Sequence, residues 1–198
     1  MLVGYILGEK DMNKQGIRRV VTGFTPDGRS TIVADGEPPR ILTRPDKPGL
    51  VVTEIWATHE AVPILPPGEA DPTLIGWHYW PEPGETLFRL VRFPPVAELE
   101  AAAAAGVELD AVSRESVMKV RGLPDDYNWQ GLAMHSTDTI DYGLVLSGEI
   151  WMVLQAGEEV LLRAGDCVVQ NGTLHGWYNK GDAACLMAFI LVGARRQK

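Results

Sequence analysis

Two stretches in the last third of the chain decide the fold: MHSTDTIDYGLVLSG at residues 134–148 and GDCVVQNGTLHGWYN at residues 165–179. Each combines short apolar and aromatic runs with a turn signal, Ser147-Gly148 in the first and Asn171-Gly172 in the second. Asn-Gly is the clearest short-range sign of a tight turn between two strands. The surrounding pattern predicts a closed meander of strands at residues 133–139, 142–147, 149–155, 158–163, 166–170, 173–178 and 184–192.

The two stretches carry residues in the order of the two cupin motifs. In the first, His135 precedes an acidic residue, Asp141, which is followed by six residues and Gly148. The second holds, in order, Gly165, Gly172, His175 and Asn179. Over residues 131–192 the sequence therefore resembles the cupin superfamily. The chain departs from the motifs at three places: Thr137 stands where a second histidine is usual, Asp141 where glutamate is usual, and Asn171 where proline is usual.

The resemblance implies a site built by His135, Asp141 and His175. As metal ligands, these three groups would hold one divalent ion (Fe, Zn, Mn or Ni) and leave open positions for substrate, as catalytic metal sites do. The alternative is a barrel that binds no metal, in which the two histidines act as general acid or base near neutral pH. Side chains repeat every two residues along a strand, so the inward partners expected to bind substrate are Thr137 and Thr139 beside His135, and Thr173 and Trp177 beside His175.

The expected fold is all-β: a cupin-type double-stranded β-helix, or jelly-roll, barrel with an N-terminal β arm and one or two short helices. We divide the chain into an extension at 1–11, N-terminal strands at 12–95, a helical connection at 96–130 and the cupin core at 131–198, all within one structural domain. The N-terminal part predicts a hairpin at 18–34, strands at 49–57, 74–80 and 86–93, and a helix from Val96 to Ala105 that ends at Gly106. A second helix is expected at 113–120 and a lid segment at 125–130.

Other residues are assigned smaller roles. The cluster Trp77-His78-Tyr79-Trp80 is expected to cap the barrel mouth or to form a subunit contact, since aromatic residues are enriched at interfaces. We expect His59 to be exposed. Cys167 and Cys185 lie in apolar runs and are expected to be buried, unreactive thiols.

Composition excludes several classes of protein. The net charge is −8, from 18 basic and 26 acidic residues, so nucleic acid is not an expected partner. No apolar run approaches the roughly 20 residues of a membrane-spanning helix, and the first residues have no basic leader, so we expect a cytoplasmic protein without membrane contact. Cupin barrels often pair, and we expect a homodimer.

The leading functional prediction is a metal-dependent cupin enzyme that acts on a small aromatic or oxo-acid substrate, with lyase or decarboxylase chemistry favoured. A non-haem Fe(II) dioxygenase is the first alternative, and a non-catalytic cupin that binds a small ligand is the second. The fold by itself does not choose among these functions.

Overall fold

The computed structural model describes residues 16–44, 47–65, 68, 70–76, 78–107 and 134–197. The chain separates into two compact units, Met1–Pro38 and Pro39–Lys198, and the boundary divides the segment 12–95 that the sequence predicts as one set of strands. Three predictions lie outside the described residues: the extension at 1–11, the helix at 113–120 and the lid at 125–130.

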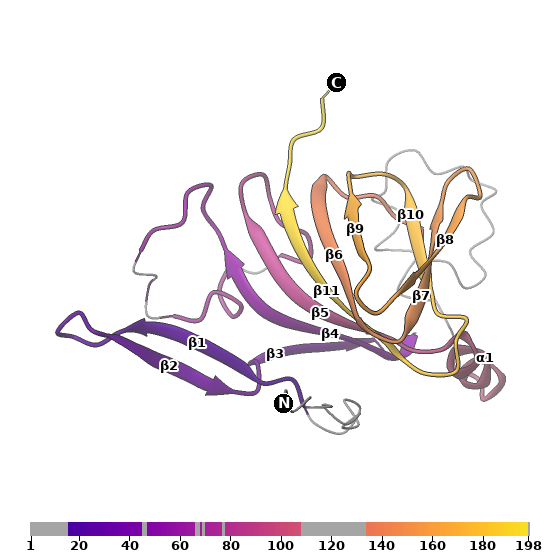
Figure 1. Ribbon diagram of the computed structural model, residues 1–198, viewed down its shortest axis with the longest axis horizontal. Helices are drawn as coiled ribbons and strands as arrows, with labels where there is room; N and C mark the ends of the chain where they lie inside the picture. The colour runs from indigo at the N-terminus through magenta and orange to yellow at the C-terminus, as the bar shows by residue number, and fades with distance from the viewer. Residues whose placement is uncertain are drawn as a thin grey trace, which may run out of the picture. The chain divides into compact units, whose positions relative to one another are not determined.

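The first unit contains one antiparallel hairpin of β1 (Arg19–Phe24) and β2 (Ser30–Gly36), as predicted at 18–34 (Figure 1). Its turn is closed by Thr25, whose carbonyl accepts a hydrogen bond from the Gly28 amide at 2.8 Å, and whose amide donates to the Arg29 carbonyl at 2.8 Å. Gly28 has a φ of 81°, which explains why glycine stands there.

The second unit is built from two antiparallel sheets (Figure 1). The six-stranded sheet has the order β3-β4-β5-β11-β6-β9, and the three-stranded sheet has the order β10-β7-β8. The strands of the larger sheet are β3 (Arg40–Arg44), β4 (Lys47–Thr58), β5 (Thr86–Phe93), β11 (Cys185–Gly193), β6 (Thr139–Ser147) and β9 (Cys167–Gln170). Those of the smaller sheet are β10 (His175–Tyr178), β7 (Glu149–Leu154) and β8 (Glu159–Arg163).

The hydrophobic core lies between these two sheets. One cluster of buried side chains joins Leu87, Val145 and Met187 of the larger sheet with Ile150 and Leu162 of the smaller one. These residues fall at alternate positions of their strands, because successive side chains of a strand point to opposite faces. The all-β barrel predicted from the sequence is therefore present.

The single described helix, α1 (Val96–Ala104), begins after Pro95 and is followed by Gly106 with a φ of 89°, close to the predicted range. The Val96 amide donates to the Asn179 carbonyl at 2.8 Å, which fixes the start of the helix to the end of β10. The Asn179 side chain is 1% exposed and donates to the carbonyls of Phe93 and Ala183 at 3.2 and 2.7 Å. Asn179, a residue of the second motif, therefore joins the start of α1, the end of β5 and the segment before β11 through hydrogen bonds.

Two strand predictions need correction, and one strand was not predicted. Residues 74–80 form turns and bends where described, not a strand, and the Asp71 carboxylate starts them by accepting hydrogen bonds from the Thr73 amide and hydroxyl at 3.0 and 2.6 Å. The predicted strand at 133–139 is reduced to one β-bridge between His135 and His175, and the strand that follows starts at Thr139. β3 was not predicted, because its five residues, RILTR, have little apolar alternation.

Candidate functional site

The site begins where the two sequence motifs meet. His135 and His175 form a backbone bridge in which each amide donates to the other residue's carbonyl, at 2.8 and 3.0 Å. Their imidazole rings lie with centroids 4.5 Å apart, tilted by 50°. Gly172 makes this approach feasible: it has a φ of 60°, and a Cβ there would lie 2.8 Å from the Thr137 carbonyl oxygen. The predicted convergence of the two histidines is therefore observed.

His175 is held in one tautomer. Its Nδ1 lies 2.9 Å from the Thr173 carbonyl oxygen, which only accepts, so Nδ1 carries the hydrogen and Nε2 carries the lone pair. Burial lowers the pKa of His175 to about 3, and the charge of His135 acts in the same direction. The ring is therefore neutral at physiological pH and presents an acceptor nitrogen.

Two tryptophans flank the histidine pair. The Trp80 ring stacks on His135 with centroids 5.5 Å apart and an interplanar angle of 24°. Trp177 meets His175 edge to face at 5.6 Å, and packs in turn against Phe189 at 5.7 Å. The inward placement predicted for Trp177 is observed, and Trp80 covers His135 as expected if its cluster caps the barrel; Trp77 of that cluster lies outside the described residues.

Asp141 occupies the inner face of β6 together with the predicted threonines. Thr137, Thr139 and Asp141 are 7%, 3% and 7% exposed. The hydroxyls of Thr137 and Thr139 are 2.6 Å apart, and Thr139 also hydrogen-bonds the Asp141 carboxylate. Burial raises the pKa of Asp141, opposed by the Thr139 hydrogen bond and the charge of Arg89. The two threonines therefore orient the carboxylate.

Gln170 lies opposite Asp141. We call these two residues, together with Thr137 and Thr139, the polar wall. The two residues are direct partners across β6 and β9, and Gln170 is 5% exposed. The Thr173 hydroxyl donates to the Gln170 Oε1 at 3.0 Å. Within the described residues, Asp141 Oδ1 and Gln170 Nε2 have no hydrogen-bond partner. Thr173 itself is exposed, because it precedes β10 and strand alternation does not extend to it.

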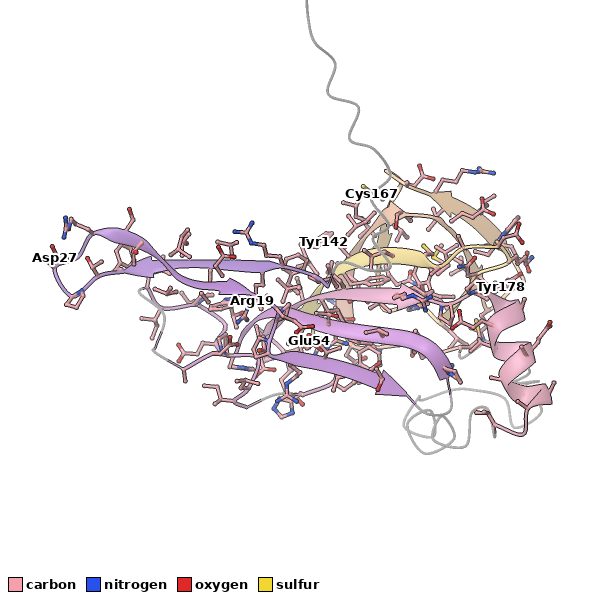
Figure 2. All side chains as sticks on the ribbon, turned by 90° about the horizontal axis from the view of Figure 1, so that it is seen from below. Arg19, Asp27, Glu54, Tyr142, Cys167 and Tyr178 are labelled. Carbon is pink, nitrogen blue, oxygen red and sulfur yellow. The ribbon has the colours of Figure 1, made fainter. Side chains whose placement is uncertain are left out.

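Sequence reasoning missed a buried ion pair next to this wall. Arg89 Nη2 lies 2.8 Å from Glu54 Oε1, with the two side chains 4% and 1% exposed. Glu54 is labelled in Figure 2. The same nitrogen donates to the Tyr79 carbonyl at 3.0 Å, and the guanidinium lies 5.1 Å from the Tyr79 ring centroid. Among described residues Arg89 Nε has no hydrogen-bond partner. Strand alternation could have predicted the burial of Arg89, because in TLFRLVRF it takes the inward position between Leu87 and Val91.

The predicted metal-ligand set does not form in this arrangement. Within the described residues, which include His135, Asp141 and His175, no three His, Cys, Asp or Glu side chains come together as a group that could hold a metal ion. The two imidazoles are adjacent, but the Asp141 carboxylate does not join them as a third ligand. Aspartate is one methylene shorter than the usual glutamate, and this carboxylate is held by Thr139. The donor types suit a divalent ion, but their positions do not.

The other histidines and the cysteines have different surroundings. His59 is partly buried rather than exposed, with Nε2 2.8 Å from the Pro72 carbonyl oxygen. His78 is exposed. Cys185 is buried, which raises the pKa of its thiol to about 12, but Cys167 is exposed, so the prediction of two buried thiols was wrong for Cys167. Its side chain points outward because the inward positions of β9 are Val168 and Gln170.

The relatives found by comparison match this chain over a third of its length or less. No family model matches the chain. The phomopsin biosynthesis cluster protein D of Diaporthe leptostromiformis is 48% identical over 63 residues, which are 31% of this chain and 33% of that protein. The cupin-domain-containing oxidoreductase fogC of Aspergillus ruber is 40% identical over 62 residues, 30% of each chain. For the cupin-domain-containing oxidoreductase virC of Hypocrea virens the identity is 41% over 46 residues, 23% of this chain and 24% of that protein. The chain spans a third or less of the length of these relatives.

The solved structures found by comparison are more distant in sequence. An RmlC-like cupin from Shewanella frigidimarina is 12% identical, with a TM-score of 0.38 over 75% of this chain and 79% of that chain. The Cupin_2 domain of an XRE family transcriptional regulator from Enterobacter cloacae is 15% identical, with a TM-score of 0.38 over 74% of this chain and 99% of that chain. Similarity at this level carries no statement about function.

Fold and motif order define an all-β barrel of two sheets with a histidine pair at its inner face. About 30% and 23% of this chain are similar to two cupin-domain-containing proteins. The described residues include no helix long and apolar enough to cross a membrane.

Proposed function

We propose that the chain is a cupin enzyme of the lyase type that binds a small, neutral, aromatic carbonyl compound and moves a proton through the His135–His175 pair. The observation that carries the proposal is the fixed tautomer of His175, with Nδ1 hydrogen-bonded to Thr173 and the Nε2 lone pair left to accept. Acid–base groups of this kind contribute about 10²–10⁴-fold to a reaction rate.

The two imidazoles act as a coupled pair. A charge on His135 lowers the pKa of His175, so the second proton is bound much less readily than the first. A pair that takes up one proton and releases it again suits an elimination. One ring removes a proton from carbon, the electron pair forms the new double bond, and the other ring gives a proton to the leaving oxygen, so water is released. The net charge of the pair is the same before and after.

The charges around the pair favour a neutral substrate. Arg89 is already paired with Glu54, and Asp141 lies close enough for the guanidinium to affect its pKa. A substrate carboxylate would add a third negative group around one positive group, which is costly in a buried site. A carbonyl oxygen, in contrast, needs only the donors that Arg89 Nε and Gln170 Nε2 offer. Elimination on a neutral compound is therefore favoured over decarboxylation of an acid.

The Trp80 and Trp177 rings give the pocket its aromatic character. Trp80 stacks on one histidine and Trp177 meets the other edge to face, so a flat ring placed beside the pair would contact π-surfaces. Ring pairs of this kind add about 0.5–1.5 kcal/mol beyond the burial of area. An aromatic substrate fits this lining better than a sugar or a polyol.

Proton transfer is testable without the natural substrate, by following deuterium exchange at the methyl group of acetophenone in D₂O by mass spectrometry. We expect exchange catalysed by the protein, and a fall of about 10²-fold or more in the His175→Gln variant. The His59→Gln variant is the matched control, because His59 hydrogen-bonds Pro72 away from the pair. Exchange that stays at the buffer rate, or that is equal in the two variants, would refute the proposal.

Benzoate provides the matched anionic probe. Acetophenone and benzoate have similar size, and we expect acetophenone to quench the tryptophan fluorescence at lower concentration. Tighter binding of benzoate would overturn the preference for a neutral compound and would favour the decarboxylase prediction. Dialysis against a chelator should leave exchange unchanged; a loss that added Fe, Zn, Mn or Ni restores would support the metal-dependent alternative instead.

The names of the relatives favour a second candidate, oxidoreductase chemistry, since two of them are called cupin-domain-containing oxidoreductases. This candidate includes the Fe(II) dioxygenase, and oxygen uptake with iron and aromatic compounds would support it. The third candidate, a non-catalytic cupin that binds a small ligand, predicts fluorescence quenching without exchange or oxygen uptake.

A further inference from the structure

The backbone pairing between the two motif stretches is interrupted beside the histidine pair. β6 and β9 pair as far as Asp141 and Gln170. The next backbone hydrogen bonds between the two stretches are those of the bridge between His135 and His175. The described segments in between, 136–139 and 171–174, share no backbone–backbone hydrogen bond with each other. The sheet therefore does not fix these two segments to one another.

Arg196, in the segment that follows β11, spans this interruption. Its Nη2 donates to the carbonyls of Thr137 and Gly172, at 3.2 and 3.0 Å. Thr137 lies two residues after His135, and Gly172 lies three residues before His175. A single side-chain nitrogen thereby joins the two stretches that carry the histidines.

The guanidinium of Arg196 is itself held in place by Asp138. Its Nε donates to Asp138 Oδ1 at 2.7 Å, and the Ala194 amide donates to the Asp138 carbonyl at 2.8 Å. The segment after β11 therefore runs beside the residues before β6, and these two strands are neighbours in the sheet (Figure 1). A guanidinium has several N–H groups in fixed directions, so it can bond a carboxylate and two carbonyls at once.

Gly172 gives the guanidinium its position between the two segments. A Cβ at Gly172 would lie 2.8 Å from the Thr137 carbonyl oxygen and 3.1 Å from Arg196 Nη2. The carbonyls of Thr137 and Gly172 accept from the same nitrogen, so two acceptors converge there. Acceptors brought together in this way are stable only with a donor between them, and Arg196 supplies it.

The contacts of Arg196 are better suited to local geometry than to global stability. The Arg196 and Asp138 side chains are 54% and 62% exposed, and ion pairs with such exposure stabilise a fold little. The residue after Gly172 is Thr173, whose carbonyl lies 2.9 Å from His175 Nδ1. The carbonyl that sets the tautomer of His175 is thus one residue away from the contact with Arg196.

We infer that Arg196 is a positioning residue: it fixes the Gly172–Thr173 peptide and thereby holds His175 in the tautomer with hydrogen on Nδ1. Arg196 acts through the Thr173 carbonyl and needs no contact with a substrate. The catalytic consequence, a correctly aimed Nε2 lone pair, rests on the proposed function. The tautomer itself is a property of the protein alone and is measured without any reaction.

Long-range ¹H–¹⁵N NMR of the histidine side chains in the full-length chain tests the inference, at about pH 8, where an ordinary imidazole is neutral. We expect Arg196→Gln to lower the ratio of the Nδ1–H form to the Nε2–H form of His175 by about threefold or more, as for the weakening of one ordinary hydrogen bond. Arg195→Gln is the matched control, because it removes the same charge from the neighbouring exposed residue. It should keep the wild-type ratio.

Two further measurements separate positioning from a general loosening of the fold. The urea midpoint of Arg196→Gln should equal that of Arg195→Gln, since both side chains are exposed. Asp138→Asn should lower the tautomer ratio less than Arg196→Gln does. The double variant Asp138→Asn/Arg196→Gln should be no worse than Arg196→Gln alone, because Asp138 acts through the guanidinium.

Deuterium exchange into acetophenone measures the catalytic consequence. We expect Arg196→Gln to lower kcat by about tenfold or more and to leave KM unchanged, because the imidazole changes its aim while the aromatic lining stays in place. A wild-type chain without exchange would refute the proposed function, and the NMR measurement would still decide the role of Arg196.

Three results would overturn the inference. The first is a wild-type tautomer ratio in Arg196→Gln. The second is an equal fall of the ratio in Arg195→Gln, which would assign the effect to net charge. The third is a fall that accompanies a lower urea midpoint, which would make Arg196 a residue of general stability. An unchanged kcat in a variant with an altered tautomer would refute the catalytic consequence alone.

Discussion

The two faces of strand β6 have the opposite polarity to those of an ordinary surface strand: the buried face is polar and the exposed face is apolar. Its inner face carries Thr139 and Asp141, which are 3% and 7% exposed, while its outer face carries Tyr142 and Leu144, which are 50% and 36% exposed. Burying polar groups costs free energy unless they are paired, and exposing apolar ones forgoes the hydrophobic gain. A strand that does both is not optimised for its own stability alone, and its inner face holds the candidate site.

The largest effect on stability is expected when one member of the buried ion pair on the inner side of the sheet is removed. Arg89→Met leaves the Glu54 carboxylate buried without its guanidinium, and we expect the free energy of unfolding to fall by about 3–5 kcal/mol at neutral pH. Urea unfolding measures it. The double variant Glu54→Leu/Arg89→Met is the control and should regain most of the loss, since it buries no charge. A single variant as stable as wild type would show that the pair is not desolvated.

The next largest effect concerns the pH dependence that His175 imposes. Its pKa in the folded chain, about 3, lies below the ordinary value of 6.5, so the unfolded chain binds the proton more readily. Stability that is present above pH 6.5 is therefore lost as the pH falls toward 3, by about 3 kcal/mol at pH 4. His175→Gln should lack this loss, which unfolding curves at pH 7, 5 and 4 would reveal. Parallel curves for the variant and wild type would contradict a buried neutral ring.

A smaller effect of opposite sign is expected at Asp141. The pKa of Asp141 is raised above 3.8 in the folded chain. As the pH rises through this range the carboxyl ionises more readily in the unfolded chain, so the folded chain loses stability. Asp141→Asn removes that cost, so the variant should gain stability relative to wild type as the pH rises from 4 to 7, by about 1 kcal/mol. The same unfolding series measures the difference. A variant that becomes relatively less stable at pH 7 would mean that the carboxylate is stabilised by partners.

The smallest effect belongs to the outer face. Leu146 is 39% exposed, and Leu146→Ala should change the free energy of unfolding by no more than about 0.5 kcal/mol when the protein is dilute. Urea unfolding measures the difference. A loss of about 2 kcal/mol or more would show that this side chain is buried in the folded chain.

Much of the architecture was predictable from local patterns. The β1–β2 hairpin, the strands from β6 to β11 and helix α1 follow from short apolar runs, turn glycines and a run of good helix formers. Errors arose where local signals were ambiguous. Residues 74–80 contain enough aromatic residues to resemble a strand, yet the Asp71 cap and Gly76, with a φ of 54°, keep the segment in turns.

The candidate site was predictable in part. The two histidines meet because their motifs fix the positions of the strands around them, and Trp177 follows by alternation along β10. Thr173 is exposed because alternation stops at the end of a strand. Trp80 and Glu54 come from segments far from the motifs, and neither the stacking of Trp80 on His135 nor the pairing of Glu54 with Arg89 was predictable from spacing.

The sequence by itself determined the all-β fold, the antiparallel strands and the meeting of His135 with His175, because turn residues and two-residue alternation act over short distances along the chain. The tertiary structure alone decided the tautomer of His175, the pairing of Arg89 with Glu54 and the position of Asp141 opposite Gln170. These depend on which side chains the closed sheets bring within about 3–4 Å, and on how much water they exclude, which no local pattern encodes.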